Sequence, residues 1–312
     1  MSSSTASELS ELPGLESAKR VVLGLISGSA VQAVLFYGMR GSGKIRLAQI
    51  LAKAWLCRQP TEEGACGECQ ACLAFERRRS ADYLEIEPAG ASRIIRLGAI
   101  SPTSPEDDDY PIPAQVFLRT PPLSARSKVV LISEAERLNP RAANSLLKTL
   151  EEPPPYARFI LLTESVGAIL PTVLSRCLAV ACEVPTGLDG FEPWALAIAG
   201  GAPGRARELQ EHAAIYRRIY EFATSLPKRS KAEGLAAAEE FATLADALQA
   251  ARRFAARAAD AEALQVLAAA YRSMPDSRPA ALQAMTEAHR RILGNANAGS
   301  AFDALFAAII GE

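Results

Sequence analysis

Four cysteines that lie close together in the sequence have the spacing of a metal site. They follow the pattern C-x8-C-x2-C-x2-C and are Cys57, Cys66, Cys69 and Cys72. Four thiolates at this density suit tetrahedral zinc, which binds sulfur at about 2.3 Å. Gly64 and Gly67 lie between them, where a compact knuckle needs tight turns. The pattern predicts a zinc-binding insert over residues 57–72, and the alternative is a set of unrelated buried or redox-active cysteines.

A glycine-rich motif indicates phosphate-binding chemistry. GMRGSGK at residues 38–44 fits the pattern G-x-x-x-x-G-K. In such a loop, successive backbone N–H groups and the N-terminus of the following helix surround phosphates, and the lysine neutralises their charge. The residues that would contact a nucleotide are Gly38, Gly41, Gly43 and Lys44.

The residues that would hold magnesium beside this loop are missing. A working loop has Ser or Thr after the lysine, because the hydroxyl binds Mg²⁺, but Ile45 stands here. A working second strand ends in Asp followed by Glu, whereas KVVLIS ends in Ser133, followed by Glu134. Phosphoryl transfer depends on the metal to neutralise developing charge. We therefore predict a degenerate loop with no Mg²⁺ site, which binds nucleotide weakly at most and does not hydrolyse it.

The segments around these motifs alternate between strand and helix patterns. Short apolar runs predict buried strands, and apolar residues at helical spacing or clear end signals predict helices. The predicted strands cover residues 31–38, 128–133, 157–165 and 178–184, and the predicted helices cover 45–56 and 140–152. Strands that alternate with helices imply a parallel sheet covered by helices, so the first part of the chain is predicted to be α/β.

The second part of the chain has a different composition. From Arg205 onward it consists mostly of Ala, Leu, Glu, Arg and Gln, which favours helix. The stretches TGLDGF and GGAPG before it are rich in turn residues. We therefore predict a short linker followed by an all-helical domain. The proline- and acid-rich segment 101–114, in the first part of the chain, is predicted to be an exposed loop.

The composition of the whole chain restricts the class of protein. Of 312 residues, 49% are apolar and 22% charged, and the formal net charge is −1. These values exclude a disordered chain or a fibre and argue against a protein that coats nucleic acid. The chain has no run of about 20 apolar residues and starts without a secretory signal pattern, which predicts a cytoplasmic protein. In that compartment six cysteines indicate metal binding or burial rather than disulfides, and burial is predicted for Cys177 and Cys182.

Several motifs occur together in one order along the chain. GMRGSGKI and the four-cysteine insert are followed by LLKTLEEPPP (146–155), LSRC (174–177), GGAPGRA (200–206) and GNANAGSAFDALF (294–306). This series resembles the delta-prime subunits of the bacterial DNA polymerase III clamp loader, a family of the AAA+ class. The resemblance implies an α/β AAA+ nucleotide-fold domain with a zinc knuckle (1–184), a small lid or linker domain (185–211) and an all-α C-terminal collar domain for oligomerisation (212–312).

The resemblance also implies a function and partners. It predicts a non-hydrolysing subunit of a clamp loader, with gamma or tau motor subunits and the delta subunit as its partners. The complex uses ATP bound in the motor subunits to open the sliding clamp and load it on primer–template DNA. An isolated arginine such as Arg176 in LSRC is usually a surface charge, but the resemblance makes it an arginine finger, presented in trans to a neighbouring subunit's ATP. The same resemblance brings Thr163 and Arg205 to positions of nucleotide sensors, and a sensor role is left open for both.

Two other functions stay open at this point. One is a gamma- or tau-type motor subunit, a weak ATPase that tolerates Ile45. The other is a DNA-binding module built on the zinc knuckle and the basic segment ERRRS beside it, residues 76–80. An ATPase assay of the isolated chain separates the motor subunit from the delta-prime type. A salt-dependent DNA titration tests the DNA-binding module.

Overall fold

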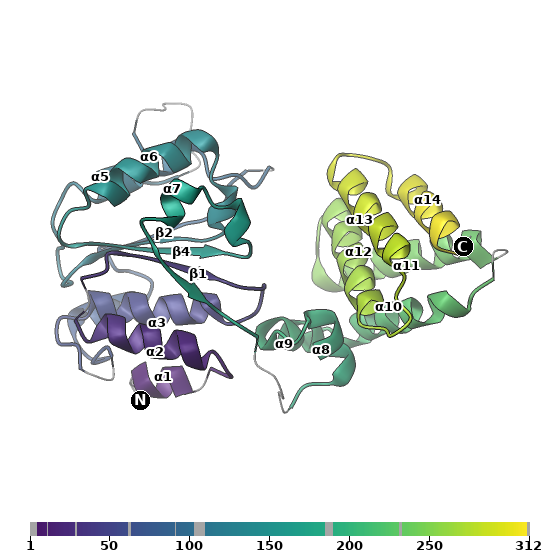
Figure 1. Ribbon diagram of the computed structural model, residues 1–312, viewed down its shortest axis with the longest axis horizontal. Helices are drawn as coiled ribbons and strands as arrows, with labels where there is room; N and C mark the ends of the chain where they lie inside the picture. Colours follow the sequence, from purple (N-terminus) through teal and green to yellow (C-terminus); the bar gives the residue numbers. More distant parts are fainter. Residues whose placement is uncertain are drawn as a thin grey trace. The chain divides into compact units, whose positions relative to one another are not determined.

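The structure of the chain, a computed structural model, describes residues 5–10, 12–28, 30–61, 64–90, 92–102, 110–184, 190–230 and 233–310. The chain divides into two compact units, Met1–Pro185 and Thr186–Glu312 (Figure 1). Residues 103–109, the centre of the predicted acidic loop 101–114, lie outside the described residues. So do residues 185–189, at the start of the predicted linker 185–211.

A five-stranded parallel sheet of order β2-β3-β4-β1-β5 forms the centre of the first unit. The strands are β1 (Ala33–Tyr37), β2 (Tyr83–Ile86), β3 (Lys128–Ile132), β4 (Ala157–Thr163) and β5 (Leu178–Ala181). The predicted parallel α/β fold is confirmed, and β1, β3, β4 and β5 lie at the predicted places. The search for apolar runs does not find β2, because its buried apolar residues are just Leu84 and Ile86.

Helices cover both faces of this sheet (Figure 1). One layer contains α1 (Thr5–Ser10), α2 (Glu16–Ile26) and α3 (Lys44–Leu56), with α4 (Gln70–Glu76) packed beside α3. The other layer contains α5 (Ala114–Phe117), α6 (Pro140–Glu151) and α7 (Pro171–Leu174). Side chains of β1 alternate between the two layers: Val34 and Phe36 belong to the core under α3, and Leu35 to the core under α6.

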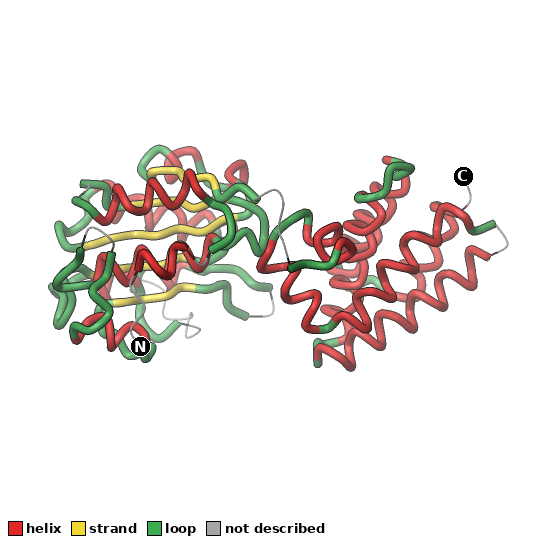
Figure 2. The backbone as a smooth tube through the Cα atoms, turned by 90° about the horizontal axis from the view of Figure 1, so that it is seen from below, coloured by secondary structure: helices red, strands yellow, loops and turns green. Residues whose placement is uncertain are grey.

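The described residues of the second unit form helices and the turns and loops between them, with no strand (Figure 2). Its helices are α8 (Pro193–Ala199), α9 (Pro203–Glu211), α10 (Ala213–Ser225), α11 (Gly234–Arg252), α12 (Ala256–Arg272), α13 (Pro279–Leu293) and α14 (Ala298–Ile310). Phe222, Phe241, Phe302 and Phe306, from α10, α11 and α14, meet in its core with ring centroids 5.0–5.6 Å apart. The predicted all-helical C-terminal region is confirmed. Its division into a linker (185–211) and a collar (212–312) stays a prediction.

Helix length and polarity in the described segments bear on membrane insertion. No helix there is both long enough and apolar enough to cross a bilayer.

A buried carboxylate ties the start of β2 to the loop before β3. Asp82 is fully buried and accepts hydrogen bonds from the backbone N–H groups of Leu123 and Ser124, both at 2.8 Å, and of Ala125 at 2.9 Å. Burial by itself raises the pKa of this carboxyl, but the three N–H donors hold the pKa below its ordinary value. The ionised carboxylate therefore stabilises the fold above its unfolded pKa of about 3.9, and the stabilisation is lost as pH falls through the lower folded pKa.

We expect Asp82→Asn to lower the free energy of unfolding by about 2–3 kcal/mol at pH 7, because an amide accepts fewer bonds and leaves backbone N–H groups unpaired. The difference from wild type should shrink as pH falls below about 4 toward the lower pKa of the folded carboxyl, where the wild-type carboxylate takes up a proton. Denaturant unfolding between pH 3 and pH 7 measures it. Glu183→Gln removes an exposed carboxylate of the same unit and should change little. A loss of equal size at both pH values would contradict the prediction.

Candidate nucleotide and metal sites

The glycine-rich loop joins the end of β1 to the start of α3. The backbone N–H of Gly38 donates to the carbonyl of Thr163 at 3.2 Å, which holds the loop against the end of β4. Gly38 has φ +156°, and a Cβ there would lie 2.4 Å from the carbonyl oxygen of Cys182. Gly41 and Gly43 have φ of 79° and 96°. All three glycines therefore adopt backbone conformations that other residues rarely take, so the loop needs the glycines at these positions.

Lys44 closes this loop on itself. Its Nζ donates to the carbonyl oxygens of Gly38 at 2.9 Å and Met39 at 3.1 Å. Burial lowers the pKa of Lys44 below the usual range of a lysine. The amine thus lies within the loop, where a phosphate oxygen would compete with two backbone carbonyls for it.

The residues at the two positions that would hold magnesium are poor magnesium ligands. Ile45 is 47% exposed at the start of α3 and has no ligand atom. Ser133, after β3, is buried, and its Oγ has no hydrogen-bond partner among the described residues. The neighbouring Glu134 forms ion pairs with Arg93 and, at 3.7 Å, with Arg137. Magnesium sites use one or two carboxylates together with phosphate oxygens, and neither position supplies a carboxylate.

Thr163 lies at the end of β4, next to Tyr37 at the end of β1. Its hydroxyl donates to the carbonyl of Ser165 and accepts from the backbone N–H of Ser165, both at 3.1 Å. The side chain therefore closes a local turn, while the Thr163 carbonyl anchors Gly38. A sensor role for Thr163 stays a prediction.

The structure brings the four predicted metal ligands together. The sulfur atoms of Cys57 and Cys66 lie 3.5 Å apart, those of Cys69 and Cys72 3.5 Å, and those of Cys66 and Cys72 4.0 Å. All four lie within 4.8 Å of one another. Four sulfurs around zinc at about 2.3 Å would be about 3.8 Å apart, so the cluster fits a tetrahedral zinc ion.

The surroundings of the cysteines shift their pKa values in opposite directions, and burial raises the pKa values of Cys57 and Cys72. The backbone N–H of Cys66 donates to Sγ of Cys57 at 3.3 Å, and that of Cys69 donates to Sγ of Cys66 at 3.4 Å. Burial raises the pKa of a thiol, but hydrogen bonds from the backbone of Arg58 and Cys72 lower the pKa of Cys69 to about 6. Cys69 is therefore ready to bind as a thiolate, the form in which cysteine ligates a metal. Zinc held here would cross-link the segment after α3 to the start of α4.

Arg176 lies at the amino-terminal ends of the strands, opposite the ends that carry the glycine-rich loop. It comes just before β5, whose first residue Leu178 pairs with Val34 near the start of β1. Gly38 follows the end of β1, so the two residues are about 20 Å apart along the strand direction. Arg176 therefore cannot serve the phosphate loop of its own chain.

The Arg176 side chain is held in place and partly exposed. Its Nη2 lies 2.5 Å from Oε1 of Glu151, its Nη1 donates to the carbonyl of Thr172 at 2.9 Å, and the side chain is 33% exposed. The guanidinium borders a cleft of about 330 Å³ on this edge. Sequence reasoning did not identify Glu151 as its partner, although Glu151 lies within the LLKTLEEPPP motif.

Arg205 takes part in a buried ion-pair network of the second unit. Its guanidinium pairs with Glu262 and, at 2.7 Å, with Glu208, which also pairs with Arg252 at 2.6 Å. The hydroxyl of Tyr216 donates to Glu262 at 3.2 Å. Although burial lowers the pKa of Arg205, the attraction of Glu262 raises it above its usual value. The network joins α9 to α11 and α12, and a sensor role for Arg205 stays a prediction.

Comparisons with known proteins place the chain among DNA polymerase III subunits. The family model described as DNA polymerase III, delta subunit, matches residues 17–185. The DNA polymerase III subunit delta' of Pseudomonas aeruginosa is 35% identical over 191 residues, which are 57% of this chain and 55% of that protein. The subunit tau/gamma of Haemophilus influenzae is 36% identical over 155 residues, 50% of this chain and 20% of that protein. The matched parts thus span about half of these relatives' length, or less.

A fold comparison covers more of the chain. A gamma subunit-related DNA polymerase III protein from Thermotoga maritima has a TM-score of 0.51, covers 95% of this chain and 98% of its own, and is 20% identical. This likeness shows a shared fold. A glycine-rich loop between the first strand of a parallel sheet and a helix places the first unit in the class of P-loop nucleotide folds. The family model matches more than half of the residues, and the chain belongs to the DNA polymerase III delta-subunit family.

We expect the full-length chain to carry one zinc ion, and Cys69→Ser to lower both zinc content and the melting temperature of the first unit. Three thiolates and a hydroxyl bind zinc more weakly than four thiolates, and the binding free energy of a structural metal contributes to folding. Metal analysis of freshly purified, reduced protein and competition with a chelator at pH 7 measure these changes.

Cys177→Ser is the matched control for this experiment. Burial raises the pKa of Cys177 to about 12, and the residue lies outside the cluster, so its loss should leave zinc content unchanged. Wild-type protein that holds no zinc under these conditions would contradict the zinc assignment.

Proposed function

We propose that the chain is a non-hydrolysing, delta-prime-type subunit of a DNA polymerase III clamp loader. The placement of Arg176 carries this proposal. A partly exposed arginine, oriented by Glu151 and about 20 Å from the loop of its own chain, is suited to a nucleotide held by a neighbouring subunit. In this role Arg176 is an arginine finger that stabilises charge on the transferring phosphoryl group in trans.

The state of the glycine-rich loop supports the non-hydrolysing part of the proposal. Lys44 is engaged by carbonyls of the loop, and Ile45 and Ser133 stand where magnesium ligands are needed. A loop of this kind keeps the architecture of a nucleotide site and lacks the groups that neutralise charge in the transition state. The chain would then bind nucleotide weakly at most and act on the ATP of its neighbours.

The remaining parts of the chain take structural roles in this proposal. The zinc knuckle stabilises the α/β domain (1–184), residues 185–211 form a short lid or linker, and the helices of 212–312 join the collar of the complex. The partners are gamma or tau motor subunits and the delta subunit. Through the assembled complex the chain acts on the sliding clamp and primer–template DNA, in the cytoplasm.

A gamma- or tau-type motor subunit is the second candidate. The 36% identity to the tau/gamma subunit of Haemophilus influenzae favours it. We expect instead that the isolated full-length chain hydrolyses ATP no faster than background with Mg²⁺ present, because Ile45 and Ser133 stand at the two positions where magnesium ligands are needed. A phosphate-release assay measures this rate. Magnesium-dependent activity in wild type that Lys44→Ala abolishes would favour the motor subunit.

The finger role predicts a specific defect for Arg176→Ala in a reconstituted complex. Arginine fingers accelerate phosphoryl transfer by roughly 10³–10⁵, or about 4–7 kcal/mol of barrier. We expect ATP hydrolysis to slow only at the site of the neighbouring subunit. The total ATP turnover of the complex should therefore fall only in part, whereas clamp loading should be impaired. Arg176→Lys should rescue poorly, because an ammonium lacks the planar fork of the guanidinium. Single-turnover hydrolysis resolved by site and a clamp-loading assay measure both effects.

Arg20→Ala removes an exposed arginine of α2 and serves as the matched control. Both variants should assemble normally and keep their zinc. Unchanged site-resolved hydrolysis and loading rates for Arg176→Ala would leave Arg176 as an ordinary surface arginine.

A further inference from the structure

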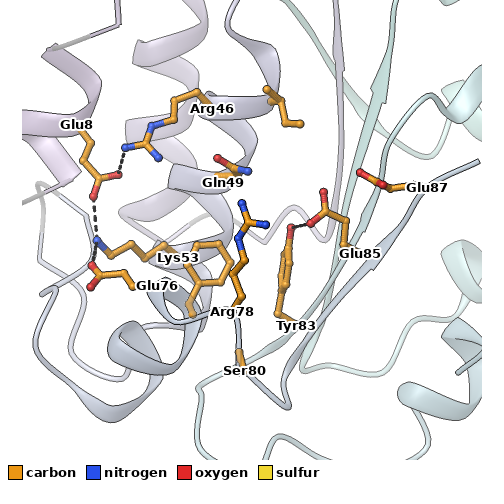
Figure 3. A pocket seen from close by; sticks show the side chains of 12 residues that line it. Glu8, Arg46, Gln49, Lys53, Glu76, Arg78, Ser80, Tyr83, Glu85 and Glu87 are labelled. Carbon is orange, nitrogen blue, oxygen red and sulfur yellow. Dashed lines mark hydrogen bonds and ion pairs between the residues drawn. The ribbon is translucent and has the colours of Figure 1, made fainter. Parts of the chain in front are cut away.

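A pocket of about 710 Å³ lies in the first unit between α3, the end of α4 and the strand β2 (Figure 3). It is separate from the cysteine cluster and from Arg176, and it meets the glycine-rich loop region at Ile45 alone. Its volume is in the range of sites that hold a ligand or a peptide side chain. The proposed function gives it no role.

The inner wall of the pocket consists of charges that neutralise one another. Lys53 is buried and pairs with Glu8 at 2.9 Å and with Glu76 at 2.8 Å, and Arg46 lies 3.6 Å from Glu8 (Figure 3). This wall has two cations and two anions. It is therefore a closed structural network that joins α1, α3 and α4, and a ligand would gain little from it.

The strand wall of the pocket is acidic. Tyr83 and Glu85 lie two residues apart on β2, so their side chains share the face that looks toward α3, and Glu87 lies just after the end of β2 on the same side (Figure 3). The hydroxyl of Tyr83 donates to Glu85 at 3.2 Å. Burial and the neighbouring Glu87 both raise the pKa of Glu85. The carboxylates of Glu85 and Glu87, two residues apart, repel each other, and a cation between them would relieve that repulsion.

Two other polar groups of the pocket are available to a ligand. In the part of the chain that the structure describes, the side chains of Gln49 and Arg78 form no hydrogen bond or ion pair (Figure 3). Both can donate to carbonyl oxygens of an entering chain. Arg78 offsets one of the two strand carboxylates, so this side of the pocket keeps a net negative charge.

The backbone of β2 also has an open edge. β2 is the outermost strand of the sheet. The carbonyl of Asp82, just before β2, accepts a bond from Val129 of β3, and the carbonyl of Ile86 accepts one from Ser133, just after β3, both at 2.9 Å. In a parallel strand, alternate residues face opposite neighbours, so the backbone groups of Tyr83 and Glu85 point away from β3. Those groups have no backbone hydrogen bond to any described residue. An unpaired edge of this kind is a template for a further strand.

We propose that β2 and this pocket form a docking site for an extended, basic segment of a partner protein. The segment adds to the open edge of β2 through main-chain hydrogen bonds, as in other cases of β-strand addition. Its side chains on the pocket side lie beside Glu85 and Glu87, so alternate Lys or Arg residues form cross-strand pairs with them. The aliphatic stems of those residues pack against Phe75 and Ile45 at the pocket wall.

This proposal does not depend on the finger role of Arg176. The acidic strand wall of the pocket also disfavours nucleic acid as the ligand. A phosphate backbone would meet the carboxylates of Glu85 and Glu87, whereas a basic peptide is attracted by them. Main-chain pairing also needs an extended chain with free N–H and carbonyl groups, which a peptide supplies.

The test uses the zinc-loaded full-length chain and a fluorescein-labelled heptapeptide of alternating Arg and Val. Fluorescence anisotropy should show saturable one-to-one binding, and hydrogen exchange should slow in residues 83–87. The double substitution Glu85→Gln, Glu87→Gln should weaken binding by about tenfold, since two cross-strand charge pairs are lost. Glu221→Gln with Glu239→Gln removes two exposed carboxylates of α10 and α11 and should leave the affinity unchanged.

A second peptide separates strand addition from charge attraction in wild-type protein. N-methylation of alternate residues keeps every charge and removes the N–H groups that pair with β2, so binding should be lost. The proposal is overturned if the methylated peptide binds equally well, if no saturable binding occurs, or if the pocket substitutions weaken binding no more than the control pair. Protection of residues 83–87 by oligothymidylate instead of the peptide would identify a nucleic-acid surface and also overturn it.

Discussion

The parallel pairing of β1 with β4 and β5 is the constraint on which the rest of the first unit depends. Parallel pairing places the carboxyl-terminal ends of all strands on one side of the sheet and their amino-terminal ends on the opposite side. The glycine-rich loop follows the carboxyl-terminal end of β1, and Arg176 precedes the amino-terminal end of β5. One chain thus presents a phosphate-type loop on one side and an arginine on the other. The proposed finger role requires this arrangement, because in that proposal Arg176 acts at the nucleotide site of a neighbouring subunit.

The glycine-rich loop is held in place by contacts within the chain. Gly38 packs so closely on the carbonyl of Cys182 that a side chain is excluded, and the Thr163 carbonyl fixes its N–H. Lys44 then binds the carbonyls of Gly38 and Met39. These contacts involve neither Ile45 nor Ser133, so the shape of the loop does not depend on a metal ligand at either position.

Buried polar groups connect elements that apolar packing alone would leave loosely oriented. Asp82 fixes the loop before β3, Lys53 joins three helices around the pocket, and Arg205 joins α9 to α12. Each charge is paired or hydrogen-bonded, as burial requires. The cysteine cluster and the Lys53 network both involve α3 and α4, since α4 carries both Cys72 and the Glu76 that pairs with Lys53. A metal ion held by the cysteines would therefore be linked to the shape of the pocket through α4.

The sequence by itself determined the features that depend on residue type and local spacing. These are the four cysteines within sixteen residues, the glycines of the loop, the residue types at the two predicted magnesium positions, the apolar runs of four strands and the helical composition after Pro185. The tertiary structure alone decided which distant residues meet. Arg176 and Glu151 are 25 residues apart, and Arg205 and Glu262 are 57 apart. The tertiary structure alone also revealed β2, its open edge and the acidic wall of the pocket, because a short strand of mixed polarity has no hydrophobic periodicity that sequence reasoning could detect. Local spacing fixes backbone conformation and ligand geometry, whereas ion pairs and sheet edges depend on how the chain folds back on itself.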